Sequence, residues 1–466
     1  MQTRNAFPVA AGIAVLILGG CKPLPDVTAL IAGASRSGKA PAIIDARGPV
    51  PEQRRQALLQ QLLDAGPAPG MLARHLPVAA AIANAPLVAG NRVTLLEDGP
   101  AIEAAIREIV AGAKKHVNVE TYVLADDEVG RRFADLLVRK CVEHVPVTLM
   151  YDSFASRDTP KRFFDRLRNA GVRVLETNPI NPFNARVRWM PNHRDHRKIF
   201  IVDGSVAVIG GANIEHPYAV NRETYWRDTD IRLEGPAVAQ LQTLFMQTWR
   251  EQGGAPLADA DYFPMVPDKG DQVVRVLGST GETSPIYSTL ISAIAASRKS
   301  VYLTTPYFAP DAALLAVIEA ASIRGVDVKL VLPSFSDFPP ALAAARFHYQ
   351  ELLDAGVEIH ERQHAWLHAK TAVIDGVWST VGSTNLDRRS FLFNREVNAI
   401  MLGSEFAQQM ESSFARDMAH SRRIAAETWR RRSIAQRGGM ARESRELLVV
   451  ELPGAATQPC LCDGTL

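Results

Sequence analysis

Cysteine is scarce in this chain of 466 residues, and its few copies are not spaced for cross-links. There are four of them: Cys21, Cys141, Cys460 and Cys462. No Cys-x-x-Cys pair occurs, so the cysteines indicate no zinc site, and their spacing is not that of a disulfide framework. The sequence therefore predicts neither a disulfide scaffold nor a structural metal.

A strong excess of either charge is absent as well. The formal net charge is +2, with 47% hydrophobic and 22% charged residues. This is an ordinary globular composition, and the charge is too small to indicate a nucleic-acid partner by itself. The length allows about three domains, on a prior of roughly 150 residues for each.

Long apolar runs are also lacking. The run from Ala6 to Leu18 is shorter than the roughly 20 residues of a spanning helix. It follows Arg4 and leads into Leu18-Gly19-Gly20-Cys21, the small-residue end of a signal peptide, which resembles a bacterial lipobox. We expect residues 1–21 to be a signal peptide, Cys21 to be lipidated and the protein to associate with a membrane of the cell envelope. An ordinary signal peptide or an uncleaved anchor helix are the alternatives.

Strand and helix patterns alternate from residue 91 and then recur in the same order. One internal match is RNAGVRV (168–174) with LDAGVEI (353–359). Alternation of this kind predicts a layered α/β fold with a mixed or mostly parallel sheet, built here from a duplicated domain. We expect a closing helix from Ser404 to Arg432. The predicted division is a Pro/Ala-rich tether with short helices at 22–90, repeats at 91–252 and 271–432, a linker at 253–270 and a weakly ordered tail at 433–466.

Each repeat contains the motif H-x-K-x-x-x-x-D, as HRKIFIVD (196–203) and HAKTAVID (368–375). Both copies are rich in β-branched residues and run into Asp-Gly, which predicts a strand, a tight turn and a second strand. Residues two apart in a strand share a face, so we expect His and Lys of each motif to point the same way. An Asn follows each motif, after Gly-Gly in the first copy and after Gly-Ser in the second.

These residue types suit the cleavage of a phosphodiester. Lys198 and Lys370 supply positive charge, and Asn213 and Asn385 can donate hydrogen bonds to phosphate oxygens. Ser383 is a third predicted phosphate-binding residue. One imidazole can attack phosphorus and the other can act as acid and then base, because imidazole titrates near neutral pH.

Each catalytic His needs a carboxylate on its second ring nitrogen, which sets the tautomer and the orientation. One candidate lies downstream in each repeat, and the internal alignment makes the two equivalent: Asp228 and Glu396. Asp203 and Asp375 complete the motifs and are grouped with the catalytic residues. Their place between a strand and a turn indicates a structural role for both.

The paired motifs closely resemble the phospholipase D superfamily. Segments such as WRDT (226–229), TPYF (305–308), RRSF (388–391) and NREVN (394–398) are similar to its bacterial cardiolipin synthase branch. The resemblance implies two pseudo-symmetric α/β/α sandwich repeats that share one active site. It also implies a phosphohistidine intermediate with neither metal nor cofactor, with His196 as nucleophile and His368 as acid and base.

A cardiolipin synthase would move a phosphatidyl group from one phosphatidylglycerol to another, so phosphatidylglycerol and a membrane surface are the expected partners. A phospholipase D that hydrolyses lipids to phosphatidic acid would use the same residues, and acceptor choice depends on the exclusion of water. A nuclease or phosphodiesterase of the same superfamily is the second alternative. The near-neutral charge and the export signal argue against it, and no nucleic acid is expected.

Overall fold

The computed structural model describes most of the chain, with gaps. The described residues are 24–27, 29, 32–33, 41–64, 70–83, 85–216, 225–257, 262–281 and 283–432. The predicted signal peptide, the lipidation site Cys21 and the predicted tail lie outside these residues.

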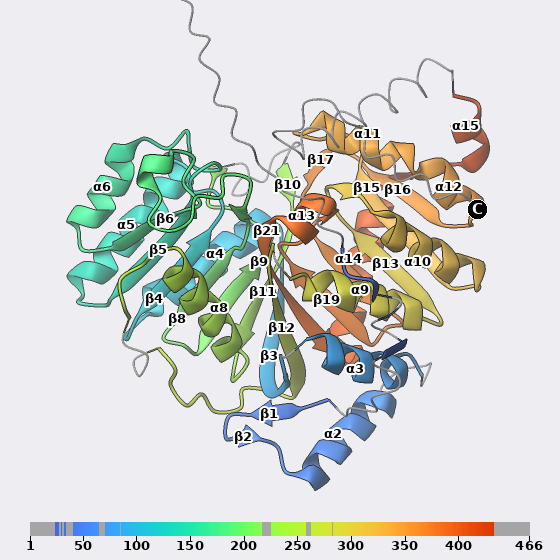
Figure 1. Ribbon diagram of the computed structural model, residues 1–466, viewed down its shortest axis with the longest axis horizontal. Coiled ribbons are helices and arrows are strands. Elements are labelled where there is room, and N and C mark those ends of the chain that lie inside the picture. The colour runs from blue at the N-terminus through green and yellow to red at the C-terminus, as the bar shows by residue number, and fades with distance from the viewer. Residues whose placement is uncertain are drawn as a thin grey trace, which may run out of the picture.

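The two repeats form two lobes that share one continuous sheet (Figure 1). In the first repeat the strand order is β6–β5–β4–β8–β9–β11–β3, and in the second it is β12–β21–β19–β18–β13–β15–β16. Strands β3 and β12 pair with each other and so join the halves. The order mirrors about this pair, as expected for a duplicated unit.

The strands of the first repeat match the alternation seen in the sequence. They are β3 (Leu87–Glu97), β4 (Val117–Thr121), β5 (Val147–Asp152), β6 (Arg173–Thr177), β8 (Ile199–Val202), β9 (Val206–Gly210) and β11 (Thr229–Glu234), with helices α4 (Asp98–Gly112), α5 (Glu128–Val142), α6 (Lys161–Asn169) and α8 (Val238–Glu251).

The second repeat repeats this series with small changes. Its strands are β12 (Gln272–Thr280), β13 (Ser300–Thr304), β15 (Asp327–Pro333), β16 (Glu358–Arg362), β18 (Thr371–Ile374), β19 (Trp378–Gly382) and β21 (Asn394–Leu402), and its helices are α9 (Pro285–Ala296), α10 (Ala312–Ile323), α11 (Pro339–Phe347), α12 (Tyr349–Asp354) and α14 (Ser404–Ala419).

Helices cover both faces of the sheet, which makes each repeat an α/β/α sandwich. One core lies under α4, α5 and α6, and a second lies under α9, α10 and α12. A third core joins the repeats, because Phe245 of α8 and Phe406 of α14 belong to one buried cluster with strands of both halves. The repeats are therefore packed as one body around the shared cluster.

The segment 41–90 differs from the predicted tether. Strand β1 (Ile43–Asp45) pairs with β3, and helix α3 (Met71–Ile82) packs on α9 of the second repeat. Met71 and Leu76 are buried in the core of that repeat. The sequence did not indicate helix α3 because it contains Pro77, and proline usually breaks a helix.

The predicted closing helix is also interrupted. Helix α14 ends at Ala419, strand β22 (Ser421–Arg423) follows, and a short helix, α15 (Ala426–Arg430), comes last. Strand β22 pairs with β16. Covering the open edge of β16 satisfies backbone groups that would otherwise face solvent, and this tertiary pairing outweighs helix propensity.

The aspartates that end the two motifs lie at tight turns, as predicted. Asp203 and Gly204 have φ of 53° and 60°, and Asp375 and Gly376 have φ of 54° and 65°. Two successive residues with positive φ are typical of the type I′ hairpin turn, which Asp-Gly favours. Strands β8 and β18 separate these aspartates from the histidines. We therefore assign Asp203 and Asp375 a structural role in place of the predicted catalytic one.

Asp375 holds the start of strand β13. Its carboxylate accepts from the backbone N–H groups of Arg298, Lys299 and Ser300 at 2.8–2.9 Å, and it is fully buried. We expect Asp375→Ala to lower the free energy of unfolding by about 2–4 kcal/mol, because buried donors lose their acceptor and alanine disfavours positive φ. Urea unfolding measures this loss. Asp375→Asn, which keeps one acceptor, should lose less, and equal losses would contradict the assignment.

Candidate active site

The His-x-Lys segments lie at the seam between the two repeats. His196 to Lys198 connects β7 (Arg194–Asp195) to β8, and His368 to Lys370 connects β17 (Ala365–Leu367) to β18. The segments thus lie between strands rather than within one, a small correction to the predicted hairpins. Strand β7 pairs with β21, and β17 pairs with β10 (Tyr225–Arg227), where the lobes meet (Figure 1).

The orienting carboxylates are exchanged between the repeats. Nδ1 of His196 lies 3.0 and 3.1 Å from the two carboxylate oxygens of Glu396, which belongs to the second repeat. Nδ1 of His368 lies 2.7 Å from Oδ2 of Asp228, which belongs to the first. With Nδ1 bound to a carboxylate, Nε2 of each ring is the nitrogen left for substrate. Each histidine is therefore oriented only when the repeats are packed together.

The backbone supports the same exchange. The N–H of His196 donates to the carbonyl of Arg395 at 3.0 Å, and the N–H of His368 donates to the carbonyl of Arg227 at 2.8 Å. Each donor and its acceptor come from different repeats. These main-chain contacts therefore place both histidines where the two repeats meet.

The two lysines are buried beside the histidines. Nζ of Lys198 donates to the carbonyl oxygen of His196 at 2.7 Å, and Nζ of Lys370 lies 2.7 Å from Nδ1 of His368. Burial lowers the pKa of Lys198 to about 7 and that of Lys370 to about 8. An incoming phosphate would favour the charged lysines and oppose this shift.

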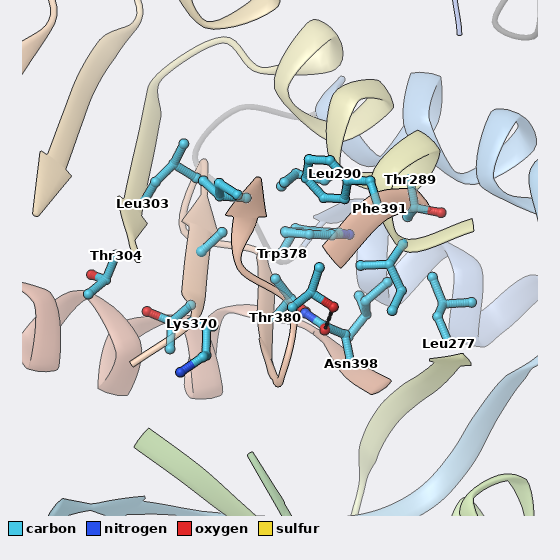
Figure 2. Close-up of a pocket in the computed structure, with 16 residues that line it drawn as sticks. Leu277, Thr289, Leu290, Leu303, Thr304, Lys370, Trp378, Thr380, Phe391 and Asn398 are labelled. Atoms are coloured by element: carbon cyan, nitrogen blue, oxygen red, sulfur yellow. Dashed lines mark hydrogen bonds between the residues drawn. The ribbon is translucent and has the colours of Figure 1, made fainter. Parts of the chain in front are cut away.

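The stem of Lys370 borders the apolar interior of the second repeat. It lines a cavity of about 30 Å³ together with Leu303, Trp378 and Phe391, and its amino group points away from Trp378 (Figure 2). A space of this size holds about one water molecule. The cavity therefore belongs to the packing behind the lysine and is too small for a substrate.

Both imidazoles are neutral in the absence of substrate. Burial lowers the pKa of His196 to about 4, against the opposing effect of Glu396. Burial and the charges of Lys370 and Lys198 hold the pKa of His368 well below its ordinary value. A bound phosphate anion would screen the lysines and raise the proton affinity of His368, as its role as acid requires.

The predicted phosphate-binding residues divide into two groups. Nδ2 of Asn213 donates to Glu215 at 3.1 Å, and Asn385 is buried without a side-chain hydrogen bond to any residue that the structure describes. Ser383 is different: its hydroxyl donates to Glu396 and accepts from the N–H of Val397 at 3.0 Å. Its assignment to phosphate is corrected, because both partners hold it against the orienting carboxylate.

Gly211 occupies the place that Ser383 takes in the second repeat. A Cβ atom at Gly211 would lie 2.5 Å from Oδ1 of Asp228. A side chain there would displace the carboxylate that holds His368. This close approach explains why the first copy reads Gly-Gly and the second reads Gly-Ser.

A family model described as "Cardiolipin synthase, PLD-like domain" matches residues 106–249 and 290–418. The chain is 36% identical over 356 residues to the cardiolipin synthase of Listeria monocytogenes serotype 4a (strain HCC23). The matched region covers 75% of this chain and 73% of that protein. It is 32% identical over 390 residues to the cardiolipin synthase of Halalkalibacterium halodurans, over 82% and 76% of the two chains. The chain belongs to the cardiolipin synthase family of the phospholipase D superfamily. The predicted family is thus confirmed.

The fold resembles that of a solved structure. The crystal structure of a phosphatidylserine synthase from Haemophilus influenzae Rd KW20 superposes with a TM-score of 0.60 at 16% identity, over 77% of this chain and 94% of that one. This likeness confirms the predicted α/β architecture with two repeats. Among the described residues, no helix has both the length and the apolar character to cross a membrane.

Two aromatic side chains frame the histidines of this cardiolipin synthase family member. The ring of Tyr122 lies 4.8 Å from that of His196, and the ring of Trp226 lies 5.0 Å from that of His368. Trp226 falls in a segment of family likeness, but Tyr122 was missed in the sequence. Tyr122 directly follows strand β4, and the end of β4 lies beside the start of β8, next to the first motif. That position is the signal by which Tyr122 could have been found.

Arg227 fixes the segment between β10 and β11 that carries Asp228. Its guanidinium bonds the carboxylate of Asp417 in α14 with two contacts of 2.9 Å and donates to the hydroxyl of Ser413 at 3.0 Å. Both partners lie in the second repeat, and all of these groups are buried. A bidentate pair of this kind positions Asp228 rigidly beside His368.

Proposed function

We propose that this protein joins two phosphatidylglycerol molecules into cardiolipin and glycerol through a phosphohistidine. The proposal rests on the crossed pairs His196–Glu396 and His368–Asp228, which present two imidazoles and two lysines from opposite sides of one seam. The names of the relatives, which are cardiolipin synthases, support the same reaction.

In the first step, Nε2 of His196 forms a bond to phosphorus while the bond from phosphorus to the glycerol oxygen breaks. His368 gives the proton that the leaving oxygen needs. In the second step, His368 takes the proton from the hydroxyl of a second phosphatidylglycerol, whose oxygen displaces His196 from phosphorus. The charges of Lys198 and Lys370 stabilise the phosphate oxygens. The amides of Asn213 and Asn385 donate hydrogen bonds to the same oxygens.

The unequal carboxylates support His196 as the nucleophile. The pKa of Glu396 stays below its ordinary value despite burial, because His196, Lys198 and Ser383 stabilise its charge. Burial instead raises the pKa of Asp228 to about 6. An ionised partner on Nδ1 makes an imidazole more basic and more nucleophilic, and His196 has the more firmly ionised partner.

Transfer is favoured over hydrolysis by the burial of the reacting groups. His196 and His368 are only 7% and 6% exposed. A phosphohistidine so enclosed has little access to bulk water, which is what a transferase requires. Purified protein supplied with phosphatidylglycerol vesicles should yield cardiolipin and glycerol in equal amounts. Phosphatidic acid as the main product would instead establish a hydrolase.

The buried lysines predict a loss of activity at alkaline pH. The pKa values of about 7 for Lys198 and about 8 for Lys370 describe the free enzyme. Because only the charged lysines attract the anionic donor, kcat/KM should fall as pH rises through 7–8. The fall in kcat should come at higher pH, since bound phosphate stabilises the ammonium groups. Profiles of both constants from pH 6 to 10 test this, and coincident profiles would contradict it.

We also propose that Cys21 carries a lipid that holds the enzyme at a membrane. The support is the sequence Leu18-Gly19-Gly20-Cys21 after a short apolar run, which lies outside the described residues. Intact-mass measurement of the mature protein from its native membrane tests the proposal. A mature chain that keeps residues before Cys21, or that has an unmodified Cys21, would remove it.

A further inference from the structure

The loop that leads to the first catalytic histidine exposes an unusual number of apolar side chains. It spans residues 178–193, between β6 and β7, and is called the 178–193 loop below. Phe183 at its short 3-10 turn is 95% exposed, and Ile180, Val187 and Trp189 are exposed as well. Exposed apolar groups gathered so closely are costly in water and mark an interaction surface.

The charge of this loop has one sign. It contains Arg186 and Arg188 but no aspartate or glutamate. Both arginines are exposed, and neither forms an ion pair with any residue that the structure describes. Beside the loop, where the N–H of Ile180 donates to the hydroxyl of Ser153, Phe154 is exposed. The guanidinium of Arg157 lies 4.7 Å from the Phe154 ring and pairs with Asp158. The loop itself therefore presents aromatic and aliphatic groups beside two arginines that are unpaired among the described residues.

The base of the loop is fixed, so its exposed residues are held in place. The indole N–H of Trp189 donates to the carbonyl of Pro179 at 2.9 Å, which closes the loop on itself. Arg389 of α13 (Arg388–Leu392), in the second repeat, donates to Asn192 at 3.1 Å. The loop is thus anchored to both repeats only a few residues before His196.

We propose that the 178–193 loop binds an anionic lipid bilayer, with Phe183 inserted among the headgroups and Arg186 and Arg188 against their phosphates. Apolar and aromatic groups interleaved with arginine match the interface of such a membrane, where acyl chains lie beside negative charge. Binding through this loop sets the catalytic seam against the surface that supplies the substrate. The inference rests on the proposed lipid substrate and adds the surface that meets the lipid.

A vesicle-binding assay on the full chain tests the loop. Cys21→Ser is included in every variant so that no lipid anchor dominates the binding. With vesicles of phosphatidylglycerol and phosphatidylcholine, Phe183→Asp should weaken binding about tenfold or more, since a buried apolar ring is lost and a negative charge is added. The matched control is Ile323→Asp at the end of α10, where the side chain is 74% exposed. It should bind as the parent does.

The double variant Arg186→Glu with Arg188→Glu tests the electrostatic contribution of the loop to vesicle binding. This double variant should lose affinity for phosphatidylglycerol vesicles, and the parent should bind neutral phosphatidylcholine vesicles weakly. Vesicle binding of Phe183→Asp equal to that of the parent would overturn the proposal. So would a parent that self-associates without lipid and becomes monomeric with Phe183→Asp, because the loop would then be a contact between two copies.

Turnover separates this inference from the proposed function. On vesicles, Phe183→Asp should lose about tenfold in rate, in step with binding. On short-chain phosphatidylglycerol below its micelle concentration, Phe183→Asp and the parent should form product equally fast. A parent that forms no cardiolipin-type product from either substrate refutes the proposed function, whereas equal slowing of Phe183→Asp on both substrates refutes the role of the loop in membrane binding.

Discussion

Replacing His196 with alanine is expected to reduce cardiolipin formation by about 10,000-fold or more. The imidazole is the only group of the protein that bonds to phosphorus in the proposed reaction, and loss of a nucleophile has effects of this size in other enzymes. His368→Ala should cost about as much with natural phosphatidylglycerol, because the leaving glycerol oxygen then has no proton donor. Product formation from labelled phosphatidylglycerol measures both losses.

A donor with a nitrophenol leaving group separates the two roles. Nitrophenolate departs without a proton, so His368→Ala should release it and retain a labelled phosphohistidine, while His196→Ala should do neither. His196→Asn serves as a second variant, since its amide can still donate to Glu396 and protect the fold. The exposed His420, replaced by alanine, is the matched control and should be fully active. Activity within about tenfold of wild type in either alanine variant would refute the assigned roles.

Glu396→Gln is expected to lower activity by about 100- to 10,000-fold, although Glu396 touches no substrate in the proposed mechanism. The carboxylate accepts from Nδ1 of His196 and so leaves Nε2 unprotonated for attack. A glutamine amide can turn its N–H₂ toward Nδ1 and select the wrong tautomer. Asp228→Asn should act in the same way on His368. Steady-state rates with phosphatidylglycerol measure both effects, and the circular dichroism spectrum checks the fold.

The crossed pairing itself is tested by stability. A double-mutant cycle of Glu396→Gln with His196→Ala should show a coupling energy above about 0.5 kcal/mol in urea unfolding, because the two side chains touch. Asp228→Asn with His368→Ala should couple in the same way. The mismatched cycle of Glu396→Gln with His368→Ala, two residues of the same repeat, is the comparison and should be closer to additive. Coupling of each histidine to the carboxylate of its own repeat would contradict the structure.

Much of the fold could be predicted from the sequence because it depends on local patterns. The alternating strands and helices, the duplication and the two Asp-Gly turns are each encoded within a few consecutive residues. The H-x-K motifs and the equivalence of Asp228 and Glu396 likewise follow from comparing one half of the chain with the other. The proposed structural role of Asp203 and Asp375 also needed only their position before a turn.

Tertiary structure decided which groups meet. His196 bonds a carboxylate 200 residues away and His368 bonds one 140 residues away, and no local pattern reports which histidine takes which acid. Ser383 was taken for a phosphate ligand because only packing shows that Glu396 already holds its hydroxyl. The sequence by itself determined the chemical groups and their duplication. The packing of two similar lobes decided their partners, since a contact across a seam depends on how the lobes dock.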